Sequence, residues 1–443
     1  MDSLLRIRVR RRTGAGLAIL LITLLPFGFG LLNDLLMLPY AVRYLLDLAC
    51  MFLLFQLIVF RRSIDSRSVR PLVLWSAIFW VISALLYAFH YQSLGYFIWG
   101  VRNNFRFYPF FLAAAVLQNE QDAEDCLKLF DGLFWINGVV CLLQYFCFGF
   151  NGDRLGGLFG TSKGCNGYMN VFFVIVLTKT LVYFLNRKEG LLNCAAKCTA
   201  ALLLAAMAEL KFFFLEFTVL VALAVLLDRF SWRSILVFVG AIIGVTVGIT
   251  VLVHIYPSFA GSMTLEKLYE AARDNKGYTS SGDMNRLTFL SMSDRLFLKD
   301  FPSRLFGMGL GNCETSNFEL FNTYFYQRYH WLHYTWLSTA MMYLEMGYVG
   351  LIFLFGFFLL NYWMTVKRQK RGANRLYCQI GKILSVCAVL ILIYNSSLRT
   401  EAAYMLYLVL ALPYIKKDSE KVNSTGKKTG KLQYQTERRP EDE

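Results

Sequence analysis

Long apolar runs alternate with short polar stretches along most of the chain. A helix needs about 20 apolar residues, at 1.5 Å rise each, to cross the hydrocarbon core of a bilayer. By this measure the pattern predicts an all-α, polytopic membrane protein with about twelve transmembrane helices. The predicted spans lie at about 14–37, 40–60, 71–90, 105–118, 128–149, 167–185, 192–208, 212–228, 235–255, 348–365, 379–396 and 402–415.

One long polar interval, residues 256–347, interrupts the apolar pattern. We expect it to form a single large extracytoplasmic loop that contains the catalytic motifs. Nine predicted spans precede it in residues 1–255, and three follow it in residues 348–415. Residues 416–443 are polar and rich in lysine, which predicts a disordered, basic cytoplasmic tail.

The distribution of basic residues predicts the orientation of the chain. Clusters of Lys and Arg near 6–12, 61–70, 187–188, 229–233, 367–375 and 416–431 all fall on one side if there are about twelve spans and both termini are cytoplasmic. The first apolar run lacks a small-residue cleavage site, so we interpret it as a retained span. These features predict a multi-pass membrane protein with both termini in the cytoplasm.

Composition excludes several classes of protein. The chain is 56% hydrophobic and only 17% charged, whereas soluble domains contain about 25% charged residues. Its net charge of +15 is explained by the clusters between spans, so we expect no nucleic-acid partner. The ten cysteines form no CxxC motif or Cys/His cluster, and we predict no metal site and no cofactor. Cys165 and Cys313 fall in predicted outer loops, and whether they pair stays open.

Charged residues also occur where they are costly or unexpected. Within the predicted spans, Arg43 and Asp47 are four residues apart on one helix and are predicted to pair. On the predicted outer side, positive charges recur although the positive-inside rule disfavours them. They are Arg102, Arg106, Arg154, Lys163, Lys211, Arg286, Arg295, Arg304, Arg328 and Arg399. Binding of a phosphate anion is one use for such residues, and pairing with loop carboxylates is the alternative.

The chemistry expected of these residues is limited by what the sequence lacks. It contains no Asp-x-Asp pair and no sizeable cytoplasmic domain for a nucleotide sugar. Outside the membrane there is no nucleotide pool, so a bond made there needs an activated group that arrives with the substrate. A lipid-linked pyrophosphate sugar is anionic, amphiphilic and delivered within the bilayer. Outward-facing arginines at helix ends match these properties.

Several short motifs, in order along residues 150–355, resemble the O-antigen ligase and Wzy polysaccharide polymerase superfamily. The motifs are Arg154-Leu-Gly-Gly157-Leu-Phe159-Gly160 followed by Asn166; Glu209-Leu-Lys211, where the family has Ser-Arg; Arg286; Phe306-Gly307-Met-Gly309-Leu-Gly311; and His333 followed by Glu345-Met-Gly347-Tyr-Val-Gly350. The resemblance implies metal-independent transfer of a glycan from undecaprenyl pyrophosphate to an acceptor hydroxyl. It also implies that the protein lies in the bacterial cytoplasmic (inner) membrane.

The resemblance also implies roles for individual residues. Arg154, Lys211 and Arg286 would neutralise the pyrophosphate leaving group. His333 or His330 would remove the proton from the acceptor hydroxyl. The alternative is that both histidines belong to an aromatic belt at the membrane interface, where side chains have polar tips. Glu345 either orients that histidine or anchors the loop. Further substrate-binding candidates are Gly157, Asn166, Gly307, Gly309, Gly311 and Arg102.

We therefore predict an enzyme that polymerises undecaprenyl pyrophosphate-linked oligosaccharide repeats into surface polysaccharide, such as capsule, exopolysaccharide or O-antigen. Its expected partners are the lipid-linked glycan and membrane lipid. Whether it also binds a flippase or a chain-length regulator stays open. A ligase that transfers the glycan to another acceptor is the alternative with the same chemistry. A transporter of lipid-linked oligosaccharide is the alternative of a different class, although the sequence contains no internal repeat.

Overall fold

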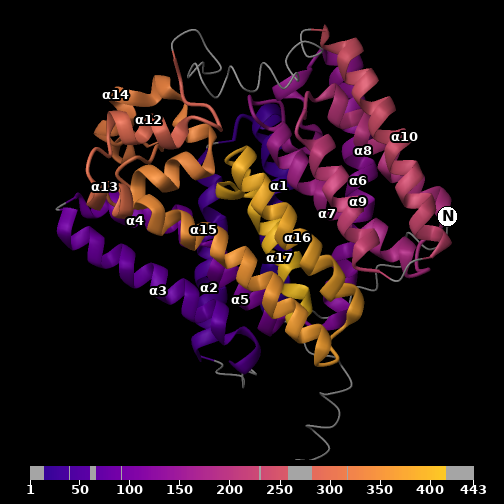
Figure 1. Ribbon diagram of the computed structural model, residues 1–443, viewed down its shortest axis with the longest axis horizontal. Helices are drawn as coiled ribbons and strands as arrows, with labels where there is room; N and C mark the ends of the chain where they lie inside the picture. Colours follow the sequence, from indigo (N-terminus) through magenta and orange to yellow (C-terminus); the bar gives the residue numbers. More distant parts are fainter. Residues whose placement is uncertain are drawn as a thin grey trace, which may run out of the picture.

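The protein is described by a computed structural model that covers residues 14–38, 40–59, 66–90, 92–228, 231–257, 282–316 and 318–415. The predicted basic tail and the first part of the predicted outer loop, at 258–281, lie outside these residues. Within the described residues the chain forms helices and turns without a β-strand, so the predicted all-α class is confirmed (Figure 1).

Sixteen α-helices make up the described part of the chain. They are α1 (Gly14–Leu36), α2 (Leu45–Val59), α3 (Ser66–His90), α4 (Leu94–Phe105), α5 (Phe107–Leu117), α6 (Glu120–Phe148), α7 (Asn166–Leu185), α8 (Leu191–Met207), α9 (Phe213–Leu226), α10 (Trp232–Ile255), α12 (Phe289–Leu296), α13 (Phe301–Phe306), α14 (Tyr324–Tyr329), α15 (Ser338–Lys370), α16 (Arg375–Tyr394) and α17 (Ala402–Ala411).

Seven of these helices in the described chain are long and apolar enough to cross a membrane: α1, α3, α6, α7, α10, α15 and α16. Three shorter apolar segments lie at α8, α9 and Ala402–Tyr414. The chain is therefore a helical membrane protein, but the expected number of about twelve spans is not confirmed in the described residues. The run predicted at 105–118 shows one reason. Pro109 lacks the N–H that would bond to the Phe105 carbonyl, and α4 ends there before α5 begins.

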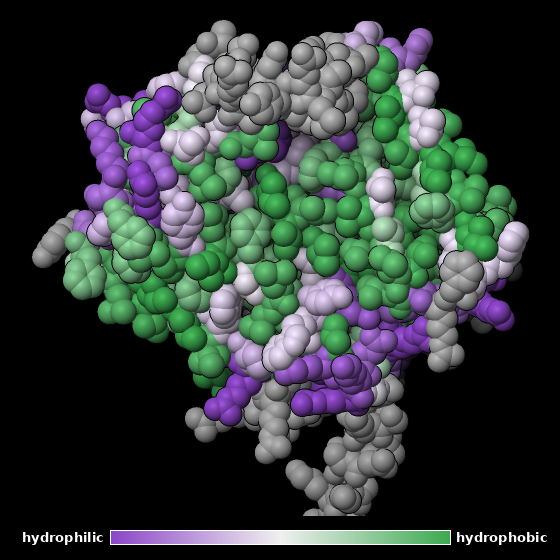
Figure 2. All heavy atoms as spheres, viewed as in Figure 1, coloured by the Kyte–Doolittle hydropathy of each residue, from purple (hydrophilic) through white to green (hydrophobic). Residues whose placement is uncertain are grey.

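The helices form an inner group and an outer group. In the apolar part of α7, 94% of residues are buried, and in α16 78%, whereas the values are 17% for α10 and 22% for α3. In Figure 1, α16 and α17 lie at the centre of the bundle, and α10 and α3 lie at its periphery. Figure 2 shows a broad apolar belt across the molecule with polar residues gathered at its lower edge. An apolar surface of this extent is typical of contact with lipid.

A network of two buried lysines and two partly buried carboxylates joins α6, α7 and α8. Lys197, which is 1% exposed, donates to Asp131 at 2.8 Å and to Glu189 at 2.7 Å. Lys179 donates to the same Asp131 and lies 3.7 Å from Glu189. We call these four residues the lysine–carboxylate network. Two cations and two carboxylates balance, which is the condition under which buried charges are tolerated.

The segment from 282 to 337 forms a small helical unit with its own core, built around Met284, Met292, Leu332 and Tyr334. It packs on the first part of α15, which is kinked at Gly347 (φ 58°). The kink frees carbonyl groups from the helix, and the amides of Met308 and Gly309 bond to the Leu344 and Glu345 carbonyls at 2.9 and 2.8 Å. The predicted boundary between loop and span at 347 falls on this kink.

Candidate functional site

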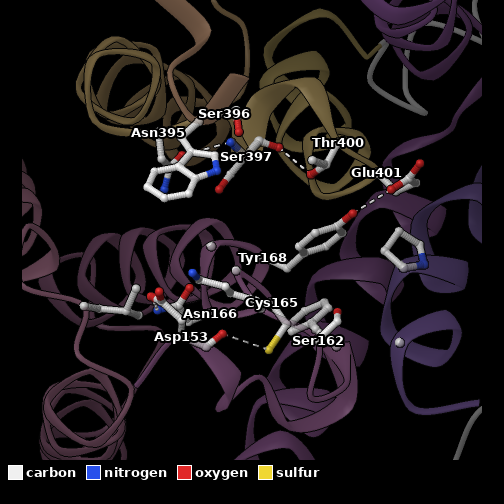
Figure 3. A pocket seen from close by; sticks show the side chains of 18 of the residues that line it. Asp153, Ser162, Cys165, Asn166, Tyr168, Asn395, Ser396, Ser397, Thr400 and Glu401 are labelled. Carbon is white, nitrogen blue, oxygen red and sulfur yellow. Dashed lines mark hydrogen bonds between the residues drawn. The ribbon is translucent and has the colours of Figure 1, made fainter. Parts of the chain in front are cut away.

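A cavity of about 580 Å³ opens where α7 begins and α16 ends. Its walls come from α1, the segment 153–168, Glu209 and Leu210, Arg286, Trp336 and the connection between α16 and α17. Figure 3 shows Ser396 and Ser397 from that connection facing Cys165 and Asn166 across an open space. These segments and Arg43, which are distant in sequence, thus meet at one end of the bundle.

One wall is the polar connection from Asn395 to Glu401. The Asn395 side chain accepts from the Ser397 amide at 2.9 Å, and its carbonyl accepts from the Ser338 hydroxyl at 2.9 Å. The Thr400 hydroxyl donates to the Ser397 carbonyl at 2.7 Å. Side-chain bonds of this kind stabilise a non-helical turn. They hold polar groups toward the cavity where two apolar helices would otherwise meet.

Glu401 is the best-anchored charge at the cavity. It accepts a 2.6 Å hydrogen bond from Tyr168 and lies 3.5 Å from Arg106 and 3.8 Å from Arg43. Burial alone would raise the pKa of this carboxyl, but the charges of Arg106 and Arg43 and the bond from Tyr168 lower it to about 2. Glu401 is therefore an anion at neutral pH. It fixes Arg43 on the cavity wall and balances the buried Arg106.

The facing wall is the segment that precedes α7. Asn166 donates to Asp153 at 3.1 Å and to the Ala208 carbonyl at 2.9 Å, which ties this segment to the end of α8. Gln144 of α6 both donates to and accepts from the backbone of Gly157, at 2.9 and 2.7 Å. Burial raises the pKa of the Cys165 thiol to about 12, which disfavours the reactive thiolate form at neutral pH.

Cations and aromatic rings line the third side. The Arg286 guanidinium lies over the Tyr394 ring, 4.2 Å from its centroid, and its Nε donates to the Tyr394 carbonyl. The Lys163 ammonium lies 5.4 Å from the Trp336 ring. On that same ring His333 stacks at 4.0 Å with an interplanar angle of 9°. A cation held over an aromatic ring keeps its direction.

The structure brings together only some of the residues predicted for substrate. Asn166 and Arg286 line the cavity, and His333 adjoins it through Trp336. Lys211 lies outside the lining and pairs with Glu209 at 2.9 Å, as the alternative of carboxylate pairing predicts. Arg154 is exposed and does not line the cavity. The predicted trio of Arg154, Lys211 and Arg286 is thus not a single cluster around this cavity.

The two histidines do not lie on one helix face. His333 has φ 54° and ends the short 3-10 turn His330–Leu332. His330 is exposed, with Nδ1 3.2 Å from the Gln327 carbonyl oxygen. His333 is therefore the histidine at the cavity.

Glu345 anchors the loop, which is one of its two expected roles. Its side chain is completely buried and Oε1 accepts from the Cys313 amide at 3.2 Å. The neighbouring Glu314 pairs with Arg399. Both Cys313 and Cys165 are buried and unpaired, so no disulfide joins them.

The glycines of the predicted binding motifs permit close packing of backbones. A Cβ on Gly311 (φ 93°) would lie 2.0 Å from the Tyr96 carbonyl oxygen, and one on Gly307 (φ 71°) 2.4 Å from the Glu345 carbonyl carbon. For Gly309 and Gly157, Cβ atoms would meet the side chains of Gln92 and Asn137 at 2.2 and 2.4 Å. None of the four lines the cavity. Their place in the structure is explained by packing alone.

Arg102 is likewise engaged away from the cavity. Its guanidinium donates to Asp47 at 2.7 and 3.1 Å and lies over the rings of Tyr44 and Trp99. The expected pairing of Arg43 with Asp47 is wrong, because Asp47 pairs with Arg102 and Arg43 with Glu401. Although Arg43 and Asp47 are close in sequence, each pairs with a residue from a distant part of the chain.

Sequence reasoning did not identify the connection between α16 and α17 as part of the candidate site. The signal was present: the seven residues from Asn395 to Glu401 include six polar side chains between two apolar runs. Within the described residues, no group of three or more His, Cys, Asp or Glu side chains could hold a metal ion. Comparison with known proteins finds no matching family model and no match among curated proteins.

Proposed function

We propose that the protein is a metal-independent glycosyltransferase that joins undecaprenyl pyrophosphate-linked oligosaccharide repeats into surface polysaccharide at the outer face of the cytoplasmic membrane. The observation that supports this best is the cavity of about 580 Å³ at one end of an apolar helix bundle, lined by Arg43, Lys163 and Arg286. A lipid tail would lie along the bundle while its charged head group enters the cavity.

The charge balance of the cavity favours an anionic head group. Its lining contains three cations and also three carboxylates, Asp153, Glu209 and Glu401. Two of these carboxylates already face cations outside the lining, since Glu401 pairs with Arg106 and Glu209 with Lys211. With those partners, the groups named at or beside the cavity are five cations and three carboxylates. Guanidinium and ammonium groups in a confined site would stabilise the pyrophosphate as its charge grows in the transition state.

The proton from the acceptor hydroxyl would go to His333. In this step the acceptor oxygen bonds to the anomeric carbon, the bond from that carbon to the pyrophosphate oxygen breaks, and undecaprenyl pyrophosphate leaves with the bonding electrons. A neutral imidazole nitrogen can accept this proton, which suits a general base. Its position against Trp336, which lines the cavity, favours His333 over the exposed His330.

A second candidate, transport of a lipid-linked oligosaccharide, is favoured by Glu216. This carboxyl on α9 is completely buried in an apolar helix. Ionisable residues within spans often mark a transport route. The two candidates differ in their product, because a transporter releases no undecaprenyl pyrophosphate.

The test is the turnover of a lipid-linked repeat by the purified protein in nanodiscs, followed as released undecaprenyl pyrophosphate and as glycan length. Arg286→Gln should lower the rate by about 10²–10³-fold, and His333→Asn by about 10²–10⁴-fold. Asn is chosen because it tolerates the positive φ of position 333.

Two matched controls, Arg154→Gln and His330→Asn, alter the same residue types at exposed positions outside the cavity lining and should keep the wild-type rate. Full-length polymer from either test variant would contradict the assigned role. Loss of activity on addition of a chelator would contradict the metal-independent mechanism.

A further inference from the structure

A second cavity, of about 560 Å³, lies at the opposite ends of the helices that frame the first. The first cavity includes Asn166 and Tyr394, where α7 begins and α16 ends. The second includes Asn186, which follows α7, and Arg375, the first residue of α16. A helix of 20 residues is about 30 Å long, which equals the hydrocarbon thickness of a bilayer. The two cavities are therefore separated by about one membrane.

Three arginines from three different segments line this second cavity. Arg233 of α10 donates from Nη1 to the Phe184 carbonyl at 2.7 Å and lies over the Phe184 ring, 4.9 Å from its centroid. Arg375 donates from Nη2 to Asp228 at 2.9 Å. Arg187 is exposed and makes no hydrogen bond or ion pair from its side chain to another residue of the described ranges.

These contacts orient the guanidinium groups of Arg233 and Arg375 but use only some of their hydrogen-bond donors. A guanidinium has five N–H donors, and the bonds above use one on Arg233 and one on Arg375. With Asp228 as the lining carboxylate, the pocket keeps an excess of two positive charges. The planar forks of arginine match phosphate oxygens well. The pocket is therefore suited to a phosphate group.

The surroundings of the pocket are those of a membrane interface. Trp232 lines it and is 71% exposed, and tryptophan is enriched where the bilayer meets water. From Trp232 the outer face of α10 runs away from the pocket with Phe238, Ile242 and Ile243 between 54% and 59% exposed. A ligand with a phosphate head and apolar chains would fill the pocket and lie along this face.

We propose that this pocket binds the phosphate of an anionic phospholipid, held by Arg187, Arg233 and Arg375, with its acyl chains along α10. Basic pockets between helices on the cytoplasmic side of membrane proteins bind anionic head groups, and the charge distribution predicts this end of the bundle to be cytoplasmic. The proposal is independent of the chemistry at the first cavity.

The test is binding of short-chain phosphatidylglycerol to the full-length protein in neutral detergent, measured by native mass spectrometry. Arg187→Gln is the informative variant, because this exposed side chain supports no described contact. An arginine near a lipid phosphate contributes about 1 kcal/mol, so affinity should fall about fivefold. Lys188→Gln removes the same charge one position away, outside the lining, and should stay within about twofold.

Three results would overturn the proposal. If Arg187→Gln and Lys188→Gln weakened lipid binding equally, the lipid would be attracted by the basic surface in general and not by this pocket. Equal binding of phosphatidylcholine would exclude recognition of an anionic lipid. Glycerol phosphate that binds as tightly as phosphatidylglycerol would assign the pocket to a soluble phosphate ester and not to a lipid.

Discussion

Replacing Glu401 by glutamine tests whether this carboxylate holds the cavity wall together. Gln has nearly the same shape and can still accept the hydrogen bond that Tyr168 now donates to the carboxylate at 2.6 Å. What it removes is the negative charge opposite Arg106 and Arg43. Arg106 is 8% exposed, so its guanidinium would remain buried without that counter-charge.

Two estimates of the cost agree. Removing one partner of a buried ion pair costs about 3–5 kcal/mol. Independently, the fall in the pKa of the Glu401 carboxyl from 4.5 to about 2 corresponds to about 3 kcal/mol, at 1.36 kcal/mol per unit. We expect Glu401→Gln to lower the free energy of unfolding at pH 7 by about 3 kcal/mol.

The pH dependence follows from the direction of the pKa change. A carboxyl whose pKa is lower in the folded state stabilises the protein fully above pH 4.5, and that stabilisation is lost as the pH falls toward 2. The wild type and Glu401→Gln should therefore converge in stability over this range. Unfolding by SDS in mixed micelles, followed by circular dichroism at several pH values, measures both quantities.

A suitable control is Glu319→Gln, which removes an exposed carboxylate and should change stability by less than about 0.5 kcal/mol. The reasoning would be refuted if Glu401→Gln matched the wild type at pH 7. It would also be refuted if the difference between the two proteins were the same at pH 7 and pH 3.

Other predictions concern the packing, the buried charges and the orientation of the chain. Gly311→Ala should destabilise the fold by about 2 kcal/mol or more in the same SDS titration, because its φ is 93° and the new Cβ would lie 2.0 Å from the Tyr96 carbonyl oxygen; wild-type stability would contradict this. Lys197→Met leaves two carboxylates of the lysine–carboxylate network facing one lysine and should cost about 3–5 kcal/mol near neutral pH, and a neutral or stabilising effect would argue against that network. A cysteine at Ser162 should react with an impermeant maleimide added to intact cells, and one at Arg371 only after lysis; the reverse pattern would overturn the predicted orientation.

Hydropathy located helices well where an apolar run was long and uninterrupted. The runs predicted at 167–185 and 235–255 coincide with α7 and α10. It failed where polar residues lie on a helix that packs against other protein segments. Helix α4 was not predicted, because Arg102, Asn103 and Asn104 make its sequence too polar for a span. Inside the protein these groups find partners, among them Asp47 and Glu314.

The candidate site was predictable only in part, because its partners are distant in sequence. Asn166 and Arg286 were proposed from motifs and do line the cavity. The pairs that shape it could not be read from spacing, since Arg43 and Arg106 meet Glu401 across most of the chain. Glycine motifs were also ambiguous, because a glycine that allows a ligand to approach has the same sequence signature as one that allows a helix to approach.

The most direct test of the account is a cryo-EM map of the protein in nanodiscs with undecaprenyl pyrophosphate bound. We predict density for the pyrophosphate inside the cavity, in contact with Arg43, Lys163 and Arg286, and density for the polyprenyl chain leading from it along the helices. Pyrophosphate density elsewhere on the protein, for example beside the exposed Arg154, with the cavity empty, would contradict the central claim.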